Sequence, residues 1–425
     1  MDALMLPSNW QRVRLGDMTT SFTKQTGFDY SDFIKPTLIK EYLPNYIPFI
    51  QNKDFLGHYI NYKTDYFIPN EIAIRFPQIL LNEKCLLISI SGAIGNVAVF
   101  NHSQNAFIGG AIAVLKFKEK KSLDFVMHFL MSASGQKLLL NSVKSSSHKN
   151  LTIADLRDLL IPLPPLNEQI AIANILSDVD RYLYSLDALI LKKESVKKAL
   201  SFELLSQRKR LKGFNQAWQR VRLGDICEFG NGGAYETLIV ENGDFKLISL
   251  NSIDIDGNLK NTMKRVNFYD NSLKQDDIVM VLSDVAHGDF LGLCAVIPSN
   301  DYVLNQRMGR LRKRNDCINI LFLRLYINAN QKYFKMQGQG SSQLNLSKKA
   351  IEDFEILLPP LNEQIAIANV LSGLDNEIIS LKNKKRQFEN IKKALNHDLM
   401  SAKIRVLKKL TPQKLKANPL FKGNP

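Results

Sequence analysis

Cysteine is scarce in this chain of 425 residues, and long apolar runs are missing. The four cysteines, Cys85, Cys227, Cys294 and Cys317, are far apart and include no C-x-x-C pair, which argues against a disulfide framework or a zinc knuckle. We expect buried thiols. No segment approaches the roughly 18 uninterrupted apolar residues of a membrane span, and the start MDALMLPSNW lacks a basic stretch followed by an apolar run. These absences favour a globular, cytoplasmic protein without a membrane partner.

Motifs of common catalytic and cofactor sites are also missing. The sequence has no G-x-x-x-x-G-K-[ST] loop for nucleotide phosphates, no H-E-x-x-H and no Cys/His cluster of metal spacing. SGAIGN, at 91–96, lacks the third glycine and the following acid of a dinucleotide fingerprint, so we expect a turn there. The N-P-P-[FYW] and D-P-P-Y tetrapeptides of amino-methylating DNA enzymes do not occur. We therefore expect no catalytic residue, metal or cofactor in this chain; an enzyme with an unrecognised site is the alternative.

Positive charge is abundant. The net charge is +15 and the pI is about 9.4, which attracts polyanions and is expected of a protein that binds DNA or RNA. Ribosomal factors and proteins of membrane surfaces share this property. Charge alone therefore does not identify the partner.

Two long motifs each occur twice. PPLNEQIAIAN fills 164–174 and 359–369, and WQRVRLGD fills 10–17 and 218–225, in the same order in both halves. The chain is therefore a tandem duplication. The two tryptophans are 208 residues apart, far more than the roughly 20 to 50 residues of solenoid repeats, so each half has the size of a domain. Between the motifs the halves diverge, which suggests one fold with two different surfaces.

A helical pattern follows each copy of the proline motif, with apolar residues mostly three or four positions apart. This alternation is the period of a coiled-coil seam and predicts two amphipathic helices of roughly 35 to 40 residues. Similar stripes favour pairing of the helices with each other; packing of each on its own domain is the alternative. The stripes are Ile172, Leu176, Val179, Leu183, Leu186, Ile190, Val196 and Leu200, and Leu374, Ile378, Leu381, Phe388, Ile391, Leu395 and Leu399.

The divergent segments predict α+β domains. Short β-branched and aromatic runs alternate with turn residues, and the helical stretches LDFVMHFLMSASGQKLLL and NILFLRLYINANQKYF follow them. Each domain closes with a polar loop, at 143–152 and at 337–347. The expected organisation is an α+β domain at 1–150, a helical segment at 151–212, a second α+β domain at 213–345, a second helical segment at 346–404 and a flexible basic tail at 405–425.

The duplicated Trp-x-x-x-x-Leu-Gly-Asp starts and the PLPPLNEQ and LLPPLNEQ helices resemble those of the specificity subunit of type I restriction-modification systems. The resemblance runs from Trp10 to about Ile404. It implies a non-catalytic subunit whose two target-recognition domains each read one half of a bipartite double-stranded DNA target. The two spacers would form an antiparallel coiled coil in a pseudo-two-fold internal repeat. Two methyltransferase subunits, which would use S-adenosylmethionine, and in restriction two motor-nuclease subunits would assemble around it.

The repeated proline motif supplies the candidate partner-binding residues. Even its polar positions are identical in both copies, which suggests that two identical partners each contact one copy. The candidates are Pro164, Leu166, Glu168, Gln169, Pro359, Leu361, Glu363 and Gln364. The alternative is that these residues only begin the helix and pack at the junction with the recognition domain.

Candidate DNA-binding residues come from the two polar loops and from one basic segment. Ser, Gln, His and Lys contact phosphates and base edges, although solvated linkers have a similar composition. In NQRMGRLRKR, at 305–314, we predict that Arg307, Arg310, Arg312 and Arg314 lie on one face of a strand or ribbon; a solvated outer face is the alternative. The candidates are Lys144, Ser146, His148, Lys149, Arg307, Arg310, Arg312, Gln339, Ser341 and Gln343. A different class of function is a scaffold that does not bind DNA and dimerises partners through the duplicated helices.

Overall fold

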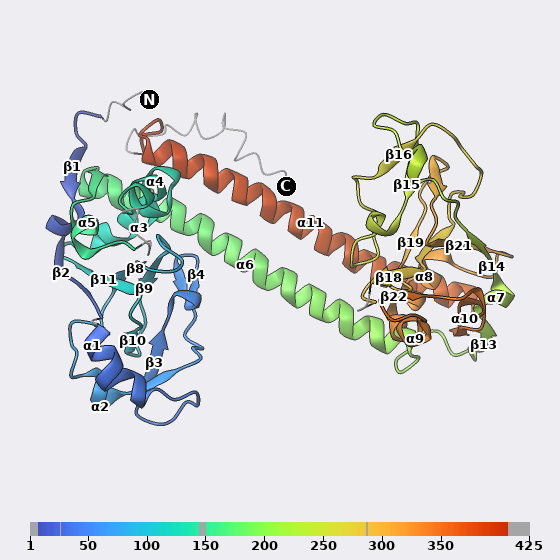
Figure 1. The fold of residues 1–425 in the computed structure, drawn as a ribbon, viewed down its shortest axis with the longest axis horizontal. Coiled ribbons are helices and arrows are strands. Elements are labelled where there is room, and N and C mark those ends of the chain that lie inside the picture. Colours follow the sequence, from blue (N-terminus) through green and yellow to red (C-terminus); the bar gives the residue numbers. More distant parts are fainter. Residues whose placement is uncertain (1–6, 26, 144–149, 286–287, 407–425) are drawn as a thin grey trace. The chain divides into compact units, whose positions relative to one another are not determined.

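The computed structural model describes residues 7–25, 27–143, 150–285 and 288–406 (Figure 1). It divides into two compact units, Met1–Leu186 with Lys384–Pro425, and Asp187–Asn383. Each unit holds one α+β domain, called recognition domain 1 or 2 after its predicted role, and parts of the same two long helices, α6 (Leu166–Leu205) and α11 (Leu361–Met400). None of the helices in the described ranges has both the length and the apolar character needed to cross a membrane.

Recognition domain 1, in unit 1, contains two four-stranded sheets, with the strand orders β2-β11-β8-β9 and β6-β3-β10-β7. Its strands are β1 (Gln11–Arg14), β2 (Thr19–Lys24), β3 (Tyr46–Ile50), β4 (Phe55–Leu56), β5 (Tyr59–Ile60), β6 (Phe67–Pro69), β7 (Leu80–Leu81), β8 (Cys85–Ser89), β9 (Val97–Phe100), β10 (Ala106–Ile108), β11 (Ile112–Phe117) and β12 (Leu160–Leu163). Its α-helices are α1 (Gly27–Asp29), α2 (Asn70–Ala73), α3 (Leu123–Met131), α4 (Ala133–Asn141) and α5 (Ile153–Arg157).

Recognition domain 2, in unit 2, repeats this plan with sheets β14-β21-β17-β19 and β16-β15-β20. Its strands are β13 (Gln219–Arg222), β14 (Cys227–Asn231), β15 (Phe245–Ile248), β16 (Lys264–Val266), β17 (Ile278–Val281), β18 (Ser283–Val285), β19 (Cys294–Val296), β20 (Tyr302–Leu304), β21 (Met308–Lys313), β22 (Gln343–Asn345) and β23 (Glu355–Leu358). Its α-helices are α7 (Leu223–Ile226), α8 (Ile320–Ala329), α9 (Gln331–Gln337) and α10 (Lys348–Glu352).

The two domains therefore have the same fold despite their divergent sequences. In each, one sheet is antiparallel throughout, and the other contains one parallel pair, β3 with β10 or β15 with β20. The helical stretches predicted after the strands are also present, as α3 with α4 and as α8 with α9. The prediction that both halves have one fold is confirmed.

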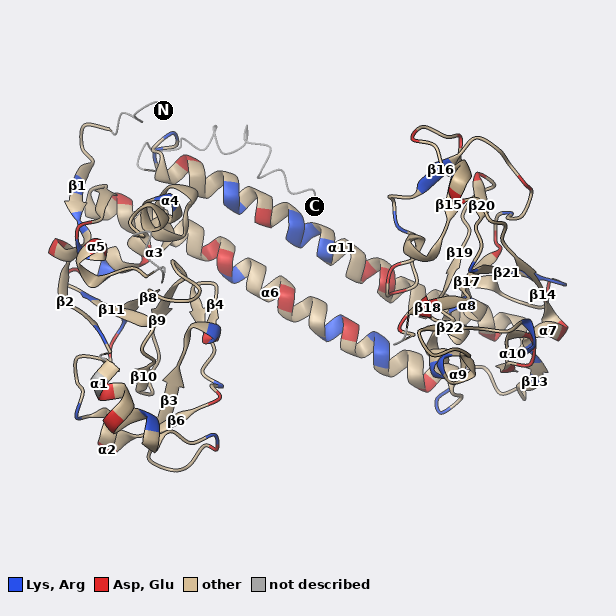
Figure 2. Ribbon diagram, in the orientation of Figure 1, with Lys and Arg blue, Asp and Glu red and all other residues tan. Residues whose placement is uncertain are grey.

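The long helices pair in antiparallel fashion within each unit. In unit 1, Tyr182 of α6 contacts Phe388 of α11, with ring centroids 4.6 Å apart. In unit 2, Nζ of Lys193 lies 2.8 Å from Oε1 of Glu377, and Lys382 lies 2.7 Å from Glu194. Figure 2 shows charges of both signs along the two helices. The predicted pairing is confirmed in both units.

Both long helices also pack on the recognition domains. Leu176 of α6 and Leu399 of α11 belong to the core of unit 1, and Leu204 and Leu371 belong to the core of unit 2. The two sequence alternatives, a paired seam and packing on a domain, therefore both occur. Val196 was predicted in the stripe, but it is 45% exposed and lies outside the buried seam.

The cysteine prediction is confirmed for three of the four thiols. Cys85, Cys227 and Cys294 are buried, and burial raises the pKa of the Cys85 and Cys227 thiols to about 12. Cys317 is exposed, which corrects the expectation at that position.

Candidate functional site

The two repeated motifs meet in each unit. Strand β1, from the Trp motif, pairs with β12, which directly precedes the proline motif; β13 pairs with β23 in the same way. The registers are equivalent, because Gln11 lies opposite Leu163 and Gln219 lies opposite Leu358. The Trp motif and the proline motif, which are distant in sequence, thus form one junction. This junction occurs once in each unit. We call these the landmark junctions.

The tryptophan of each motif anchors its landmark junction. Trp10 packs edge-on against Phe125 of α3, with ring centroids 6.3 Å apart, and Trp218 packs on Phe322 of α8 at 6.5 Å. Edge-to-face aromatic pairs add to the burial of apolar area. The conserved geometry explains why the tryptophan is identical in both copies.

Close backbone packing explains the glycine of the same motif. A Cβ atom at Gly16 would lie 3.0 Å from Cβ of Arg157, and a Cβ atom at Gly224 would lie 2.8 Å from Cβ of Glu352. Arg157 ends α5 and Glu352 ends α10. Both helices therefore approach the motif more closely than a larger residue allows.

The glutamates of the proline motif are buried at 0% exposure. Glu363 accepts hydrogen bonds from Arg210, at 3.0 Å from Nε and 2.5 Å from Nη2, and from Nε1 of Trp218 at 3.0 Å. Glu168 accepts from Arg405, at 2.8 Å from Nε and 3.1 Å from Nη2. In each unit, the arginine that follows one long helix thus neutralises the glutamate that begins the other. We call these pairs the Arg–Glu clasps.

The glutamines of the motif are buried as well. Nε2 of Gln169 donates to the Pro164 carbonyl at 2.7 Å, and Nε2 of Gln364 donates to Pro359 at 2.8 Å and to Cys317 at 3.0 Å. These bonds fix the turn between the proline pair and the helix. The glutamine side chains, like the glutamates, thus stabilise the junction through internal hydrogen bonds.

This burial changes how the candidate partner-binding residues are interpreted. Identity at Glu168, Gln169, Glu363 and Gln364 is explained by internal bonds, as the junction alternative predicted, and these side chains are not displayed to a partner. Pro164 and Pro359 are also buried. Leu166 and Leu361 are each 37% exposed, so partner contact by the motif remains a prediction that falls on these two residues.

The candidate DNA-binding loop of domain 1 lies largely outside the described residues. Lys144, Ser146, His148 and Lys149 lie outside the described residues. Next to this loop, Leu151 donates its backbone N–H to Ile90 at 3.0 Å, and in domain 2 Leu346 donates to Leu282 at 2.8 Å. Leu151 and Leu346, at the ends of the two loop segments, therefore join the fold at equivalent places.

The candidate loop of domain 2 forms a small ribbon. Strand β22 pairs with β18, and the backbones of Gln339 and Asn345 exchange hydrogen bonds of 3.0 and 2.9 Å. Gln343 donates a side-chain hydrogen bond to Ser283, whereas Gln339 and Ser341 are exposed. A two-stranded ribbon fits the major groove of B-DNA. DNA contact by the three candidates remains a prediction, and Gln339 and Ser341 are the accessible ones.

The predicted common face of the four arginines is only partly formed, because Arg310 and Arg312 are two positions apart on one strand and share a face of it, whereas Arg307 and Arg314 lie outside that strand. Arg310 and Arg312 lie on β21, but Arg307 precedes the strand in a left-handed conformation, with φ of 68°. Arg310 pairs with Glu228 at 2.6 Å, and Arg312 donates two hydrogen bonds, of 2.8 and 2.6 Å, to the buried Asp277. Of the three candidates Arg307, Arg310 and Arg312, Arg307 alone is exposed. Of these three arginines, Arg307 is therefore the one available for DNA.

Sequence reasoning missed the arginines of the clasps. Arg405 was assigned to a flexible tail, yet it is bonded to Glu168. A signal existed, because Arg210 and Arg405 are 195 residues apart, the same spacing that separates the two copies of the proline motif. No group of three or more His, Cys, Asp or Glu side chains in the described ranges could hold a metal ion.

Comparison with known sequences gives a consistent family. A family model described as type I restriction modification DNA specificity domain matches residues 7–193 and 215–390. The type I restriction enzyme MjaVIII specificity subunit of Methanocaldococcus jannaschii is 27% identical over 432 residues, which cover 96% of this chain and 95% of that protein. The type I restriction enzyme EcoBI specificity subunit of Escherichia coli is 27% identical over 121 residues, 28% of this chain and 26% of that protein.

Solved structures share the fold. The S subunit of a type I restriction-modification system from M. genitalium matches with a TM-score of 0.62 and 18% identity, over 92% of this chain and 96% of that one. A structure describing complex assembly and conformational transition of the type I R-M system matches with a TM-score of 0.53 and 16% identity, over 93% of this chain and 98% of that one. The predicted fold class, α+β domains with two long helices in an internal repeat, is confirmed.

Proposed function

The chain belongs to the type I restriction modification DNA specificity family, and on this premise we propose that each of its recognition domains reads one half of a bipartite DNA target. DNA target recognition is the function of this chain within such a system. The observation that carries the division of labour is a common fold with equivalent landmark junctions and divergent domain sequences. Different half-sites require different reading surfaces, whereas a common scaffold requires the same junction twice.

Exchange of one domain tests this division. Residues 18–150 would be replaced by the corresponding segment of a related specificity chain, and the methylated sequences would be mapped across the host genome. We expect one half of the methylated sequence to change and the other half to stay. A change in both halves would contradict the assignment of one domain to one half-site. Loss of all methylation on deletion of the chain is the control that links the motif to this protein.

The partners we propose are two methyltransferase subunits, one for each landmark junction, and, in restriction, two motor-nuclease subunits. The repeat supports this stoichiometry, because Leu166 and Leu361 offer the same exposed side chain at equivalent positions. Native mass measurement of the co-expressed complex should give two methyltransferase subunits per chain. One subunit per chain under conditions without dissociation would contradict the proposal.

We further propose that catalysis and S-adenosylmethionine belong to the partner. The purified chain alone should then transfer no methyl group to duplex DNA, whereas the complex with its methyltransferase subunits should. A scaffold that does not bind DNA is the competing function, and it is disfavoured by the net charge of +15 and by the family. Salt-dependent binding of the complex to duplex DNA separates the two functions.

A further inference from the structure

A buried polar cluster, the Asp180 node, lies where recognition domain 1 meets the helices of unit 1. The Asp180 side chain, on α6, is 4% exposed, and its Oδ1 pairs with Lys392 of α11. Its Oδ2 lies 3.5 Å from Nε2 of His58 and 4.0 Å from Nδ1 of His128. Nε2 of His128 lies 3.0 Å from the Ser177 hydroxyl. The node thus joins both helices to two elements of the recognition domain.

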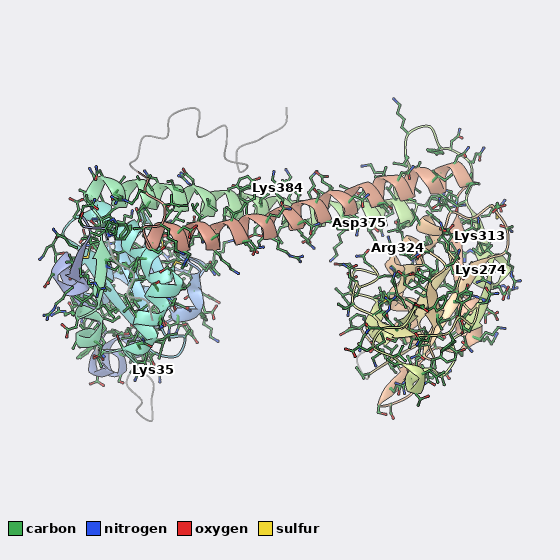
Figure 3. All side chains as sticks on the ribbon, turned by 90° about the horizontal axis from the view of Figure 1, so that it is seen from above. Lys35, Lys274, Lys313, Arg324, Asp375 and Lys384 are labelled. Atoms are coloured by element: carbon green, nitrogen blue, oxygen red, sulfur yellow. The ribbon has the colours of Figure 1, made fainter. Side chains whose placement is uncertain are left out.

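Unit 2 has a second cluster, the Asp375 node, at helix positions 195 residues away. Asp375 of α11 pairs with Lys197 of α6. The recognition domain contributes Arg324 of α8 to this node (Figure 3). Burial lowers the pKa of Arg324, and the nearby Asp375 opposes this shift. Ser372, the counterpart of Ser177, has a buried hydroxyl without a hydrogen-bond partner in the described residues.

The residues that the long helices contribute to the two nodes are therefore the same, whereas the residues that the recognition domains contribute differ. Serine, aspartate and lysine are identical at the equivalent positions of both units. Facing them are two imidazoles, His58 and His128, in unit 1 and one guanidinium, Arg324, in unit 2. A guanidinium keeps its charge throughout the accessible pH range, whereas an imidazole titrates near neutrality. The two nodes share the serine, aspartate and lysine of the long helices but differ in whether the domain side chains titrate near neutral pH.

Burial favours the neutral form of both histidines. Burial lowers the pKa of His58 below its ordinary value, opposed by the nearby Asp180 and Asp124 and reinforced by Lys392. Burial lowers the pKa of His128 to about 3, with further lowering by His58 and Lys392.

The charged groups around His128 are more basic than acidic. His128 lines a cavity of about 650 Å³, whose other charged or titratable side chains are Glu389, Lys392, Lys393 and His397. Tyr59 stacks on His58, with ring centroids 3.9 Å apart. Because Lys392 already balances Asp180, each proton taken up by a histidine leaves a net positive charge inside the node.

The sign of the pH effect follows from linkage. The unfolded chain binds protons at these histidines below about pH 6.5, and the folded node does not. The stabilisation is therefore fully present above about pH 6.5 and is lost progressively as the pH falls towards the folded pKa values. Arg324 has no comparable titration, so the Asp375 node keeps its charge balance over the same range.

We propose that Asp180 and Asp375 are positioning residues that hold each recognition domain on its helix pair, and that acidification releases domain 1 but not domain 2. This inference goes beyond the proposed function and needs no DNA for its test. In the DNA complex, release of domain 1 would weaken reading of one half-site only.

Hydrogen–deuterium exchange of the full chain between pH 7.5 and 5.0 tests the proposal, with rates corrected for the intrinsic pH dependence of amide exchange. We compare peptides from α3, which contains His128, with peptides from α8, which contains Arg324. At pH 5.0 the opening equilibrium of α3 should increase by up to about thirtyfold for each imidazole held neutral, and that of α8 should not. Equal loss of protection in α3 and α8 would overturn the proposal.

Two variants make the comparison specific. The double variant His58→Gln, His128→Gln removes both titrations and should abolish the difference in pH dependence between α3 and α8. His397→Gln, which changes an exposed histidine in the same cavity, is the matched control and should behave like the parent chain. Should the double variant not fold, the α3 and α8 comparison in the parent chain still decides. A double variant that keeps the pH dependence of α3 would also overturn the proposal.

Discussion

Each landmark junction depends on a single buried carboxylate, Glu168 in unit 1 and Glu363 in unit 2. A buried carboxylate without a partner is costly, so the arginine of the clasp is essential for its burial. The two clasps differ in one respect. Trp218 adds a third hydrogen bond to Glu363, whereas Nε1 of Trp10 is buried without a hydrogen-bond partner in the described residues. Loss of the arginine should therefore destabilise the clasp at Glu168 more than the clasp at Glu363.

The first prediction concerns these arginines. Arg405→Ala should destabilise unit 1 by about 3 kcal/mol, because Glu168 then keeps no charged donor. Arg210→Ala should destabilise unit 2 by only about 1–2 kcal/mol, since Trp218 still donates to Glu363. Chemical denaturation of the purified chain, followed by peptides of each unit in hydrogen exchange, measures both values. Equal losses would contradict this account, and Glu168→Gln combined with Arg405→Ala should recover part of the stability.

The second prediction separates two arginines of the basic segment. Arg307→Ala should leave stability unchanged and weaken DNA binding of the complex, lowering the salt dependence by about one phosphate contact. Arg312→Ala should instead destabilise unit 2 by about 3 kcal/mol, because it leaves the buried Asp277 unpaired. Salt titrations of DNA binding and denaturation curves measure the two effects. An Arg307 variant with normal affinity at all salt concentrations would exclude a phosphate contact.

Individual roles were harder to predict than residue types. The sequence identifies a basic segment, but whether an arginine faces solvent or a carboxylate depends on strands far away in the chain. Arg310 and Glu228 are 82 residues apart, and Arg312 and Asp277 are 35 apart. Spacing along one strand carries no information about such partners. The same limit concealed the clasps, in which Arg405 and Glu168 are 237 residues apart.

At the scale of elements, local sequence patterns were sufficient to predict the two long helices. The period of the apolar stripe predicted α6 and α11, and both are 40 residues long, at the upper end of the expected range. The proline pair predicted where both helices begin. The pairing of β1 with β12 and of β13 with β23 was not predicted, because each pair joins segments more than 100 residues apart. The repetition of the motifs suggested that they share a binding partner. Part of what they contact is the rest of the same chain.

The third prediction tests the packing of α10 against the Trp motif. Gly224→Ala would place Cβ 2.8 Å from Cβ of Glu352, so we expect a destabilisation of about 1–3 kcal/mol. The matched control is Gly373→Ala in α11, where nothing lies within 4 Å of the new Cβ and the glycine is exposed. That change should stabilise by about 0.5–1 kcal/mol. Thermal unfolding of both variants measures the difference. A neutral Gly224 variant would mean that α10 shifts freely.

At the scale of the whole molecule, the length of the two long helices bears on their proposed role as a spacer between the half-sites. A helix of 40 residues is about 60 Å long, which equals about 18 base pairs of B-DNA. Because the helices pair in antiparallel fashion in both units, a change in one of them disturbs the register of the other. A length change must therefore be made in both helices at matched positions.

The fourth prediction is that the helices set the gap between the half-sites. One turn of four residues is inserted after Leu186 in α6 and after Asn383 in α11. The contact of Tyr182 with Phe388 on one side and that of Lys193 with Glu377 on the other then keep their registers. The insertion adds about 6 Å, so the unread gap in the methylated sequence should lengthen by about one or two base pairs, while the bases read on either side stay the same. The same insertion in α6 alone, near Ser195, is the control and should impair assembly, because Lys197 can then no longer face Asp375. Genome-wide mapping of methylated sites measures the gap. An unchanged gap in a doubly extended chain that still methylates would mean that the partner subunits, and not the helices, determine the distance.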